Sequence, residues 1–154
     1  MLIYRGMKRK IKRFDVNKVA KEILLKVSKI KTDRARIIAM SGDLGAGKTT
    51  LTQEISKELG IKNSVVSPTF VIMKIYKINS KNEAFKEIKN LVHIDAYRLD
   101  GSKELEKIGW KNLYKNKENL IIIEWPENVK DCLDSKTYYV YLKHVDEETR
   151  IFEY

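Results

Sequence analysis

The sequence predicts an α/β fold: a mainly parallel β-sheet with helices on both faces and an antiparallel hairpin near the C-terminus. Two observations carry this prediction. Short apolar runs that suit strands alternate along the chain with segments of helical periodicity. The central runs are apolar at nearly every position rather than at every second one, which is typical of parallel strands buried on both faces.

The individual elements follow from periodicity and from helix-end residues. The first predicted helix spans residues 15–29, with Asp15 as its N-cap. The second covers residues 48–59 and stops before Gly60, which suits the position just after a helix. A third helix is predicted to begin at Ser102, its capping residue. The predicted strands are residues 36–40, 70–78, 91–94, 120–123, 137–143 and 150–154. The last two strands form the C-terminal hairpin.

Length and composition exclude several classes of protein. The 154 residues suit one domain, residues 1–154, without a linker or repeat. A hydrophobic content of 43% excludes an intrinsically disordered chain. The single cysteine, Cys132, excludes a disulfide scaffold and a Cys-rich zinc site. The longest apolar run, residues 120–123, is far shorter than the ~20 residues of a membrane helix, and the N-terminus lacks a secretory apolar region. We therefore expect a cytoplasmic protein that does not bind membranes.

The chain is strongly basic, with 31 Lys and Arg against 21 Asp and Glu and a formal charge of +10. A field of this sign attracts polyanions. Five of the seven residues 7–13 are cationic, but this cluster contains no aromatic side chain for base stacking. We expect residues 1–13 to be a frayed, solvated N-terminal segment. The alternative is a patch, over residues 8–13, that binds nucleic acid or an acidic partner.

Residues 42–49, Gly-Asp-Leu-Gly-Ala-Gly-Lys-Thr, match the phosphate-binding pattern G-x-x-x-x-G-K-[ST] in full. The glycines let backbone N–H groups wrap around a phosphate, and the helix that follows presents its positive end to it. Lys48 is expected to reach the β- and γ-phosphate oxygens, and the Thr49 hydroxyl to ligate Mg²⁺. The motif follows a predicted strand and opens a predicted helix. The sequence therefore predicts a P-loop NTPase that binds a nucleoside triphosphate with Mg²⁺.

A second metal ligand is expected at the end of a neighbouring apolar strand. Asp95 and Glu124 both end such strands, and spacing alone does not choose between them. The identity of the base is constrained by an absence: no N/T-K-x-D string, the usual guanine-binding motif, occurs in the chain. ATP is therefore the favoured nucleotide.

Four strings, taken in order, resemble the TsaE (YjeE) family of small bacterial P-loop ATPases. They are Ser-Gly-Asp-Leu-Gly-Ala-Gly-Lys-Thr-Thr (41–50), Ser-Pro-Thr-Phe (67–70), His-Ile-Asp-Ala-Tyr-Arg-Leu (93–99) and Glu-Trp-Pro-Glu (124–127). The family is required for making threonylcarbamoyladenosine in tRNA, alongside the proteins TsaB and TsaD. The resemblance implies a Mg²⁺-dependent ATPase, stimulated by these partner proteins, whose relation to tRNA is indirect.

The resemblance also implies roles for single residues. Those that match the family's ATP-binding loop are Gly42, Asp43, Leu44, Gly45, Ala46, Gly47, Lys48, Thr49 and Thr50. Thr49 and Glu124 match the family's metal ligands, which decides between the two acids. Asp95 matches an aspartate important for ATP turnover, so that Lys48 and Asp95 are the expected catalytic residues. Asp95 would position the attacking water or a metal-bound water.

Further matches surround the phosphates. Ser67 and Thr69 lie in a stretch that resembles a switch-like loop facing the γ-phosphate, and Trp125 matches a tryptophan beside the nucleotide. Two stretches depart from the family. Residues 13–17 lack the Ser/Thr-rich character that the family shows near the adenine, and residues 79–90 are longer and more charged than its usual turn.

Two other functions remain open from the sequence. The P-loop alone also suits a small-molecule kinase, which would need an acceptor pocket and usually an arginine-bearing lid; residues 111–117 contain no arginine. A nucleic-acid-binding module with a vestigial P-loop is the other alternative. The intact Lys48-Thr49 pair argues against it.

Overall fold

The computed structural model describes residues 6–154, which build one seven-stranded sheet in the order β1-β7-β6-β2-β5-β4-β3. The strands are β1 (Lys8–Lys12), β2 (Arg36–Ser41), β3 (Met73–Lys77), β4 (Asn90–Asp95), β5 (Asn119–Glu124), β6 (Tyr138–His144) and β7 (Thr149–Glu153). The four central strands are parallel, and β6 and β7 form the predicted hairpin. The outer strands β1 and β3 are antiparallel to their neighbours, so the parallel part is the middle of the sheet rather than most of it.

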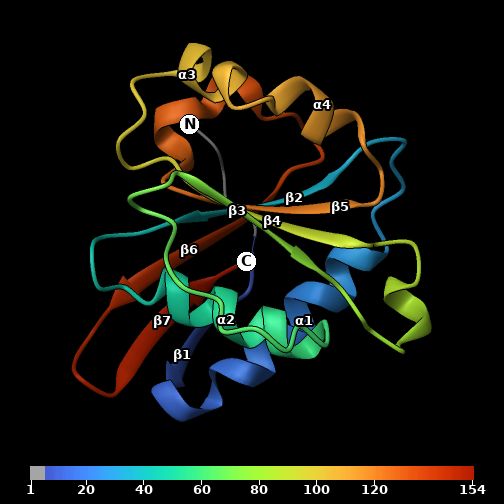
Figure 1. Ribbon diagram of the computed structural model, residues 1–154. Helices are drawn as coiled ribbons and strands as arrows, with labels where there is room; N and C mark the ends of the chain where they lie inside the picture. The colour runs from blue at the N-terminus through green and yellow to red at the C-terminus, as the bar shows by residue number, and fades with distance from the viewer. Residues whose placement is uncertain (1–5) are drawn as a thin grey trace.

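Helices cover both faces of the sheet, as predicted (Figure 1). One face carries α1 (Val16–Ser28) and α2 (Lys48–Glu58). The other carries α3 (Ser102–Lys107), α4 (Trp110–Lys115) and the 3₁₀ segment η3 (Pro126–Cys132). Two short 3₁₀ turns are η1 (Arg13–Asp15) and η2 (Glu83–Phe85). No helix of the described residues is both long and apolar enough to cross a membrane.

The sheet carries a separate apolar core on each face because side chains alternate along a strand. Ile38 and Met40 of β2 belong to the core beneath α1 and α2. Ile121 and Ile123 of β5 belong to the core beneath α3 and α4. All four side chains are fully buried, and burying a side chain of this size contributes ~1.5–3 kcal/mol to the stability of the fold. The two cores fix the central strands rigidly, and the site is built at their ends.

The N-terminal basic segment forms a strand, so the expectation that residues 1–13 fray was wrong for residues 8–12. β1 pairs with β7 along its whole length. Three ion pairs tie its cations to acidic side chains: Lys8–Glu153 (3.2 Å), Arg9–Glu22 (2.7 Å) and Lys12–Glu148 (3.4 Å). Charged residues on an edge strand leave no apolar alternation for sequence reasoning to detect. Residues 1–5 of the predicted segment lie outside the described part.

The predicted strand over residues 70–78 begins only at Met73. The preceding residues form a turn, in which the N–H of Val71 donates to the carbonyl of Pro68 at 3.0 Å. Ile72 follows with a φ of +65°, a conformation that a β-branched side chain rarely adopts. The turn aims the Ser67–Thr69 stretch back toward the ends of the central strands.

Two predicted helix starts are confirmed, but without the expected capping hydrogen bonds. Asp15 is the N-cap residue of α1, and its carboxylate forms an ion pair with Lys18 at 2.6 Å instead of accepting from a backbone N–H of the helix. Ser102 is the first residue of α3, after the N-cap residue Gly101, and its hydroxyl donates to Asp131. The third predicted helix is broken into α3 and α4 by Gly109, which has a φ of +87°.

The site residues meet because parallel strands end at one edge of the sheet. The P-loop follows β2, Glu124 ends β5 and Asp95 ends β4. In the sheet register Glu124 lies opposite both Met40 of β2 and Asp95. Ligands of open α/β sheets bind outside these carboxyl ends.

Candidate nucleotide site

The P-loop, residues 42–47, connects β2 to α2 in a backbone shape that only glycine adopts freely. Gly42 and Gly47 have φ angles of +145° and +104°. A Cβ on Gly42 would lie 2.3 Å from the carbonyl oxygen of Leu142, so the loop passes directly against β6. The loop therefore begins in a fixed position and leads into the N-terminus of α2, a ready site for a phosphate.

Lys48 is almost buried at the start of α2, with 6% of its surface exposed. Its ammonium donates hydrogen bonds to the carbonyls of Gly42 and Asp43, the latter at 3.0 Å, and lies 4.1 Å from the centre of the Trp125 ring. Burial lowers the pKa of Lys48 from its ordinary value, while Glu124 and other nearby carboxylates act in the opposite direction. The cation is thus held over the cavity without a direct carboxylate partner.

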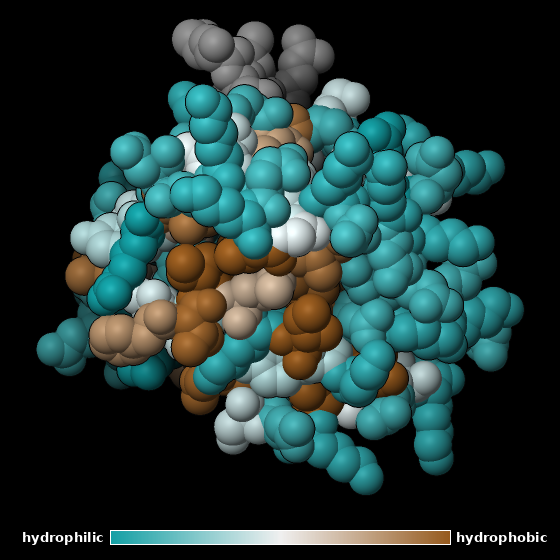
Figure 2. Space-filling view, turned by 45° about the horizontal axis from the view of Figure 1, so that its top comes forward, coloured by the Kyte–Doolittle hydropathy of each residue, from teal (hydrophilic) through white to brown (hydrophobic). Residues whose placement is uncertain are grey.

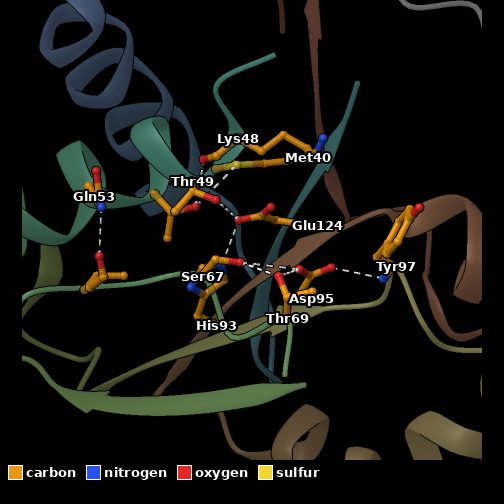
Figure 3. A network of polar contacts seen from close by, with 12 residues as sticks. Met40, Lys48, Thr49, Gln53, Ser67, Thr69, His93, Asp95, Tyr97 and Glu124 are labelled. Carbon is orange, nitrogen blue, oxygen red and sulfur yellow. Dashed lines mark hydrogen bonds and ion pairs between the residues drawn. The ribbon is translucent and has the colours of Figure 1, made fainter. Parts of the chain in front are cut away.

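Glu124 is the centre of a buried polar contact (Figure 3). Its Oε1 lies 3.3 Å from the hydroxyl oxygen of Thr49 and 2.8 Å from Nε2 of His93. Because a carboxylate only accepts hydrogen bonds, both neighbours donate to it. His93 is fully buried, and its Nδ1 has no partner among the described residues. Among the described residues, the imidazole therefore makes one side-chain hydrogen bond, and this bond holds Glu124 in place.

Asp95 holds the loop that precedes β3. Its Oδ2 accepts from the hydroxyl of Thr69 at 2.6 Å and from that of Ser67 at 3.5 Å. Its Oδ1 accepts from the backbone N–H of Tyr97 at 3.0 Å. Asp95 is 4% exposed, and hydrogen bonds orient both of its carboxylate oxygens. Figure 3 shows these groups converging beside Glu124.

The side chains of Lys48, Thr49, Asp95 and Glu124 all line one cavity of about 390 Å³. Its lining includes the predicted residues Leu44, Gly45, Gly47, Lys48, Thr49, Thr50, Ser67, Thr69, Asp95, Glu124 and Trp125. Three residues of the predicted ATP-binding loop do not line it. Gly42 packs against β6, Ala46 is buried in the core, and Asp43 is exposed and offers only its carbonyl to Lys48.

Sequence reasoning missed several residues of the cavity wall. Arg13, Val16, Arg150 and Phe152 line it on the side opposite Asp95. Arg13 was considered only as part of a basic surface cluster, and no local pattern marks Arg150. His93 was also missed, although it stands two residues before Asp95 and so projects from the same face of its strand.

The donor set fits Mg²⁺. Thr49 and Glu124 offer a hydroxyl and a carboxylate, the oxygen ligands that this ion prefers. Among the described residues, no three His, Cys, Asp or Glu side chains gather into a metal cage. Mg²⁺ is commonly bound through one or two protein oxygens together with substrate phosphates, and this site has that form.

Comparison with known proteins agrees with the geometry. A family model described as "Threonylcarbamoyl adenosine biosynthesis protein TsaE" matches residues 12–152. The chain belongs to the TsaE family. This match includes both the P-loop and β7, so every lining residue of the cavity, from Arg13 to Phe152, lies within the matched range.

Individual relatives of this TsaE chain support the assignment. The "tRNA threonylcarbamoyladenosine biosynthesis protein TsaE" of Haemophilus influenzae is 35% identical over 130 residues, 84% of this chain and 75% of that protein. The protein of the same name from Rickettsia typhi is 36% identical over 116 residues, 75% of this chain and 74% of that one. The crystal structure of Bacillus subtilis YdiB matches with a TM-score of 0.68 at 23% identity, covering 99% of this chain and 87% of that chain. This last likeness shows the fold.

Proposed function

We propose that this TsaE chain is a Mg²⁺-dependent ATPase, a single domain, that serves threonylcarbamoyladenosine modification of tRNA. One observation carries the proposal. A single cavity joins the P-loop, the Thr49–Glu124 oxygen pair and the oriented carboxylate of Asp95. These are the parts that phosphoryl transfer to water requires: a phosphate cradle, metal ligands and a group that orients the nucleophile.

The P-loop side binds and orients the phosphates. Backbone N–H groups of the loop residues that line the cavity, 44, 45 and 47–50, and the ammonium of Lys48 receive the β- and γ-phosphate oxygens. Thr49 and Glu124 would hold Mg²⁺, which would supply positive charge to the phosphates. His93 keeps Glu124 aimed at the cavity by its hydrogen bond of 2.8 Å.

Asp95 directs the attacking water. Its carboxylate accepts a hydrogen bond from the water, whose oxygen forms the new bond to the γ-phosphorus as the bond to the ADP oxygen breaks. The water's proton passes to Asp95 or to the released phosphate. Ser67 and Thr69 hold the carboxylate in place by their hydroxyl hydrogen bonds. Catalysis is then mainly positioning and charge stabilisation.

Partner proteins of the TsaB and TsaD type are proposed to stimulate turnover. Apolar side chains gather in the middle of one face of the molecule, surrounded by hydrophilic ones (Figure 2). Phe70 is 86% exposed directly after Thr69, and Tyr97 is 53% exposed directly beyond Asp95. Exposed apolar surface of this kind marks protein contacts. A partner seated here would act on the loop that holds Asp95.

Contact with tRNA is proposed to be indirect, and the protein to work in the cytoplasm. The formal charge of +10 is the argument for direct contact. In the basic segment, however, three cations of β1 are already paired with acidic side chains. These pairs lower the net positive charge that the segment presents to phosphates.

A phosphate-release assay with and without a purified TsaB–TsaD complex tests this function. We expect slow release of phosphate from ATP alone and clear stimulation by the complex. The Lys48→Ala protein, prepared in the same way, controls for contaminating ATPase. Turnover that appears only on addition of a small-molecule phosphate acceptor would instead identify a kinase.

A further inference from the structure

β1 is the outermost strand at one end of the sheet and pairs with β7 on its inner side (Figure 1). The pairing register is continuous from Lys8 to Lys12, so the strand contains no bulge, and it contains neither proline nor glycine. Among residues 6–154, no strand pairs with its outer edge. Bulges and prolines are common devices that stop a further strand from adding to an edge. The geometry of this edge therefore leaves it open to another strand.

The backbone groups at this outer edge belong to three lysines. Met7 and Tyr154 exchange both of their backbone hydrogen bonds, at 2.7 and 3.2 Å. In an antiparallel pair, hydrogen-bonded positions of this kind alternate with positions that are not bonded to the partner strand. The odd-numbered residues of β1 therefore bond to β7. The residues whose N–H and C=O groups point away from β7 are Lys8, Lys10 and Lys12.

The side chains of the same three lysines share one face of the sheet. Arg9 pairs with Glu22 of α1 at 2.7 Å, and Ile11 packs against the core beneath α1 and α2. Because side chains alternate along a strand, the three lysines project from the opposite face, and all three are exposed. A strand that adds to this edge would thus meet a lysine at every second position.

The charge of this edge favours an acidic strand. Lys10, the middle lysine, forms no ion pair within residues 6–154. Lys8 and Lys12 pair with Glu153 and Glu148, yet their side chains remain 67% and 51% exposed. Exposed pairs of this kind are weak, so both lysines can also contact a carboxylate on a neighbouring strand. Cross-strand pairs of opposite charge stabilise a sheet.

A second copy of the chain does not fit this edge. If two β1 strands paired antiparallel about a two-fold axis at Lys10, this lysine would face its own copy, and Lys8 would face Lys12. Like charges directly opposite one another destabilise a sheet. The lysines that prevent self-association thus leave a strand of opposite charge as the matching partner.

We propose that the outer edge of β1 binds an extended segment of a partner protein as an additional β-strand, and that this segment carries Asp or Glu at alternating positions. Backbone hydrogen bonds to the three lysines supply affinity, and ion pairs with their ammonium groups supply specificity. The inference does not depend on the proposed ATPase function, because residues 8–12 do not line the nucleotide cavity. It also concerns a surface at the opposite end of the sheet from β3.

The test uses a blocked peptide of about seven residues, long enough to cover β1, in which Glu alternates with Thr. The control peptide has the same composition with its Glu residues grouped together. We expect the alternating peptide to bind the full chain more tightly. In NMR-detected hydrogen exchange it should protect the amides of Lys8, Lys10 and Lys12. Equal binding of the two peptides, or no new protection of these amides, would overturn the proposal.

Two substitutions of Lys10 separate strand addition from charge attraction. Lys10→Gln and Lys10→Pro both remove the ammonium, but only proline also removes the outward N–H. Proline is tolerated at an edge position whose N–H faces solvent, and thermal unfolding checks that the variant folds. Lys10→Gln should weaken binding of the alternating peptide about threefold, as expected for one exposed ion pair. Lys10→Pro should weaken it about tenfold or more.

Equal losses in the two Lys10 variants would mean that the peptide is held by charge alone, which would overturn the proposal. If Lys10→Pro does not fold, the exchange measurement on the parent protein still decides the question. Phosphate release from ATP should be unchanged in both variants, because Lys10 does not line the cavity. Loss of peptide binding and loss of ATPase activity are therefore separate results.

Lys143→Gln is the matched control for charge on the same face. Lys143 is exposed on β6 and lies opposite Ile151 of β7, which in turn lies opposite Lys10. Because β7 and β1 separate it from the outer edge, its loss should leave peptide binding unchanged. A loss equal to that of Lys10→Gln would mean that the whole face attracts the peptide, and the assignment to the edge would be wrong.

Two other occupants of the edge would give different results, and either would overturn the proposal. Self-association in light scattering that Lys10→Pro abolishes would identify a second copy of the chain. Tighter binding of a uridine oligonucleotide than of the alternating peptide, weakened equally by both Lys10 variants, would identify a nucleic-acid surface. We expect the parent protein to show neither.

Discussion

The two sides of the P-loop are held together in different ways. On the side of β4 and β5, side chains orient one another: Glu124 accepts from Thr49 and His93, and Asp95 accepts from Ser67 and Thr69. On the side of β7 and β1, the Arg150 guanidinium is anchored by backbone carbonyls and has no carboxylate partner.

The difference follows from what each side must do. ATP hydrolysis requires oxygen atoms that are held in fixed directions. On the acidic side, the hydrogen-bond donors Thr49, His93, Ser67 and Thr69 therefore orient the carboxylates of Glu124 and Asp95. The other side, the arginine side, offers the cavity an anchored guanidinium and the apolar side chains of Val16 and Phe152. Loss of a group should therefore affect turnover or metal binding on the first side and the affinity for a ligand on the second.

The largest effect is expected at Lys48, which lies between the two sides. Lys48→Ala removes the buried cation that faces the transferred phosphoryl group. Loss of one such stabilising group typically lowers the rate about 100- to 1000-fold. Phosphate release measures it, with Lys57→Ala as the control, because Lys57 is an exposed lysine of the same helix, paired with Glu54. Hydrolysis at the parent rate would show that the phosphate assignment is wrong.

The two acids should fail differently, which sharpens the comparison within the acidic side. Glu124→Ala should raise the Mg²⁺ concentration needed for nucleotide binding by about tenfold or more. Asp95→Ala should bind ATP with Mg²⁺ nearly normally, yet turn over about 100-fold more slowly. Metal titrations and single-turnover rates of both variants measure these effects. The reverse pattern would exchange the roles of the two residues.

The acidic side is also the side that the sequence predicts. Lys48, Thr49 and Glu124 belong to short strings, each of which ends a strand or opens a helix. Because parallel strands end at one edge of the sheet, such strings meet once the fold class is known. The central strands and the first two helices are predicted for a similar reason, since each is marked by its own apolar pattern.

The arginine side could not be predicted because its position depends on distant pairing. Arg13 reaches the cavity only because Lys8 pairs with Glu153, at the other end of the chain. Nothing in the local sequence records that register, and the charged β1 lacks the alternation that marks a strand. The turn at Ile72 opposes the local preference of a β-branched residue, which rarely adopts a φ of +65°.

His93 tests whether orientation of a carboxylate matters as much as its presence. His93→Leu removes the donor to Glu124, and changes in such supporting contacts typically cost about tenfold in metal affinity. We therefore expect a higher Mg²⁺ requirement with unchanged binding of Mg²⁺-free ATP. His93→Gln retains an N–H donor and should recover part of the loss. Equal losses in both variants, with or without Mg²⁺, would mean that the imidazole only fills space.

The smallest expected effect concerns the contacts that hold the β7 and β1 side of the sheet to α1. The hydroxyl of Tyr154 donates to Glu22 of α1 at 2.6 Å, and the other oxygen of Glu22 pairs with Arg9 of β1 at 2.7 Å. Tyr154→Phe removes one buried hydrogen bond and should lower the free energy of unfolding by ~1 kcal/mol at neutral pH. Urea unfolding measures it.

The same residue gives a pH dependence with a defined sign. Burial, and then the hydrogen bond to Glu22, raises the pKa of Tyr154 above its ordinary value. Above pH ~10 the unfolded chain loses the phenol proton while the folded chain keeps it, so stability falls as pH rises. Tyr154→Phe should make that fall less steep.

Tyr138 is the matched control: burial raises its pKa to about 12, but its hydroxyl has no hydrogen-bond partner among the described residues. Tyr138→Phe should therefore also flatten the alkaline fall, at little cost at neutral pH. If Tyr154→Phe unfolds at neutral pH as easily as Tyr138→Phe, the hydrogen bond from Tyr154 to Glu22 does not stabilise the contact between the end of β7 and α1.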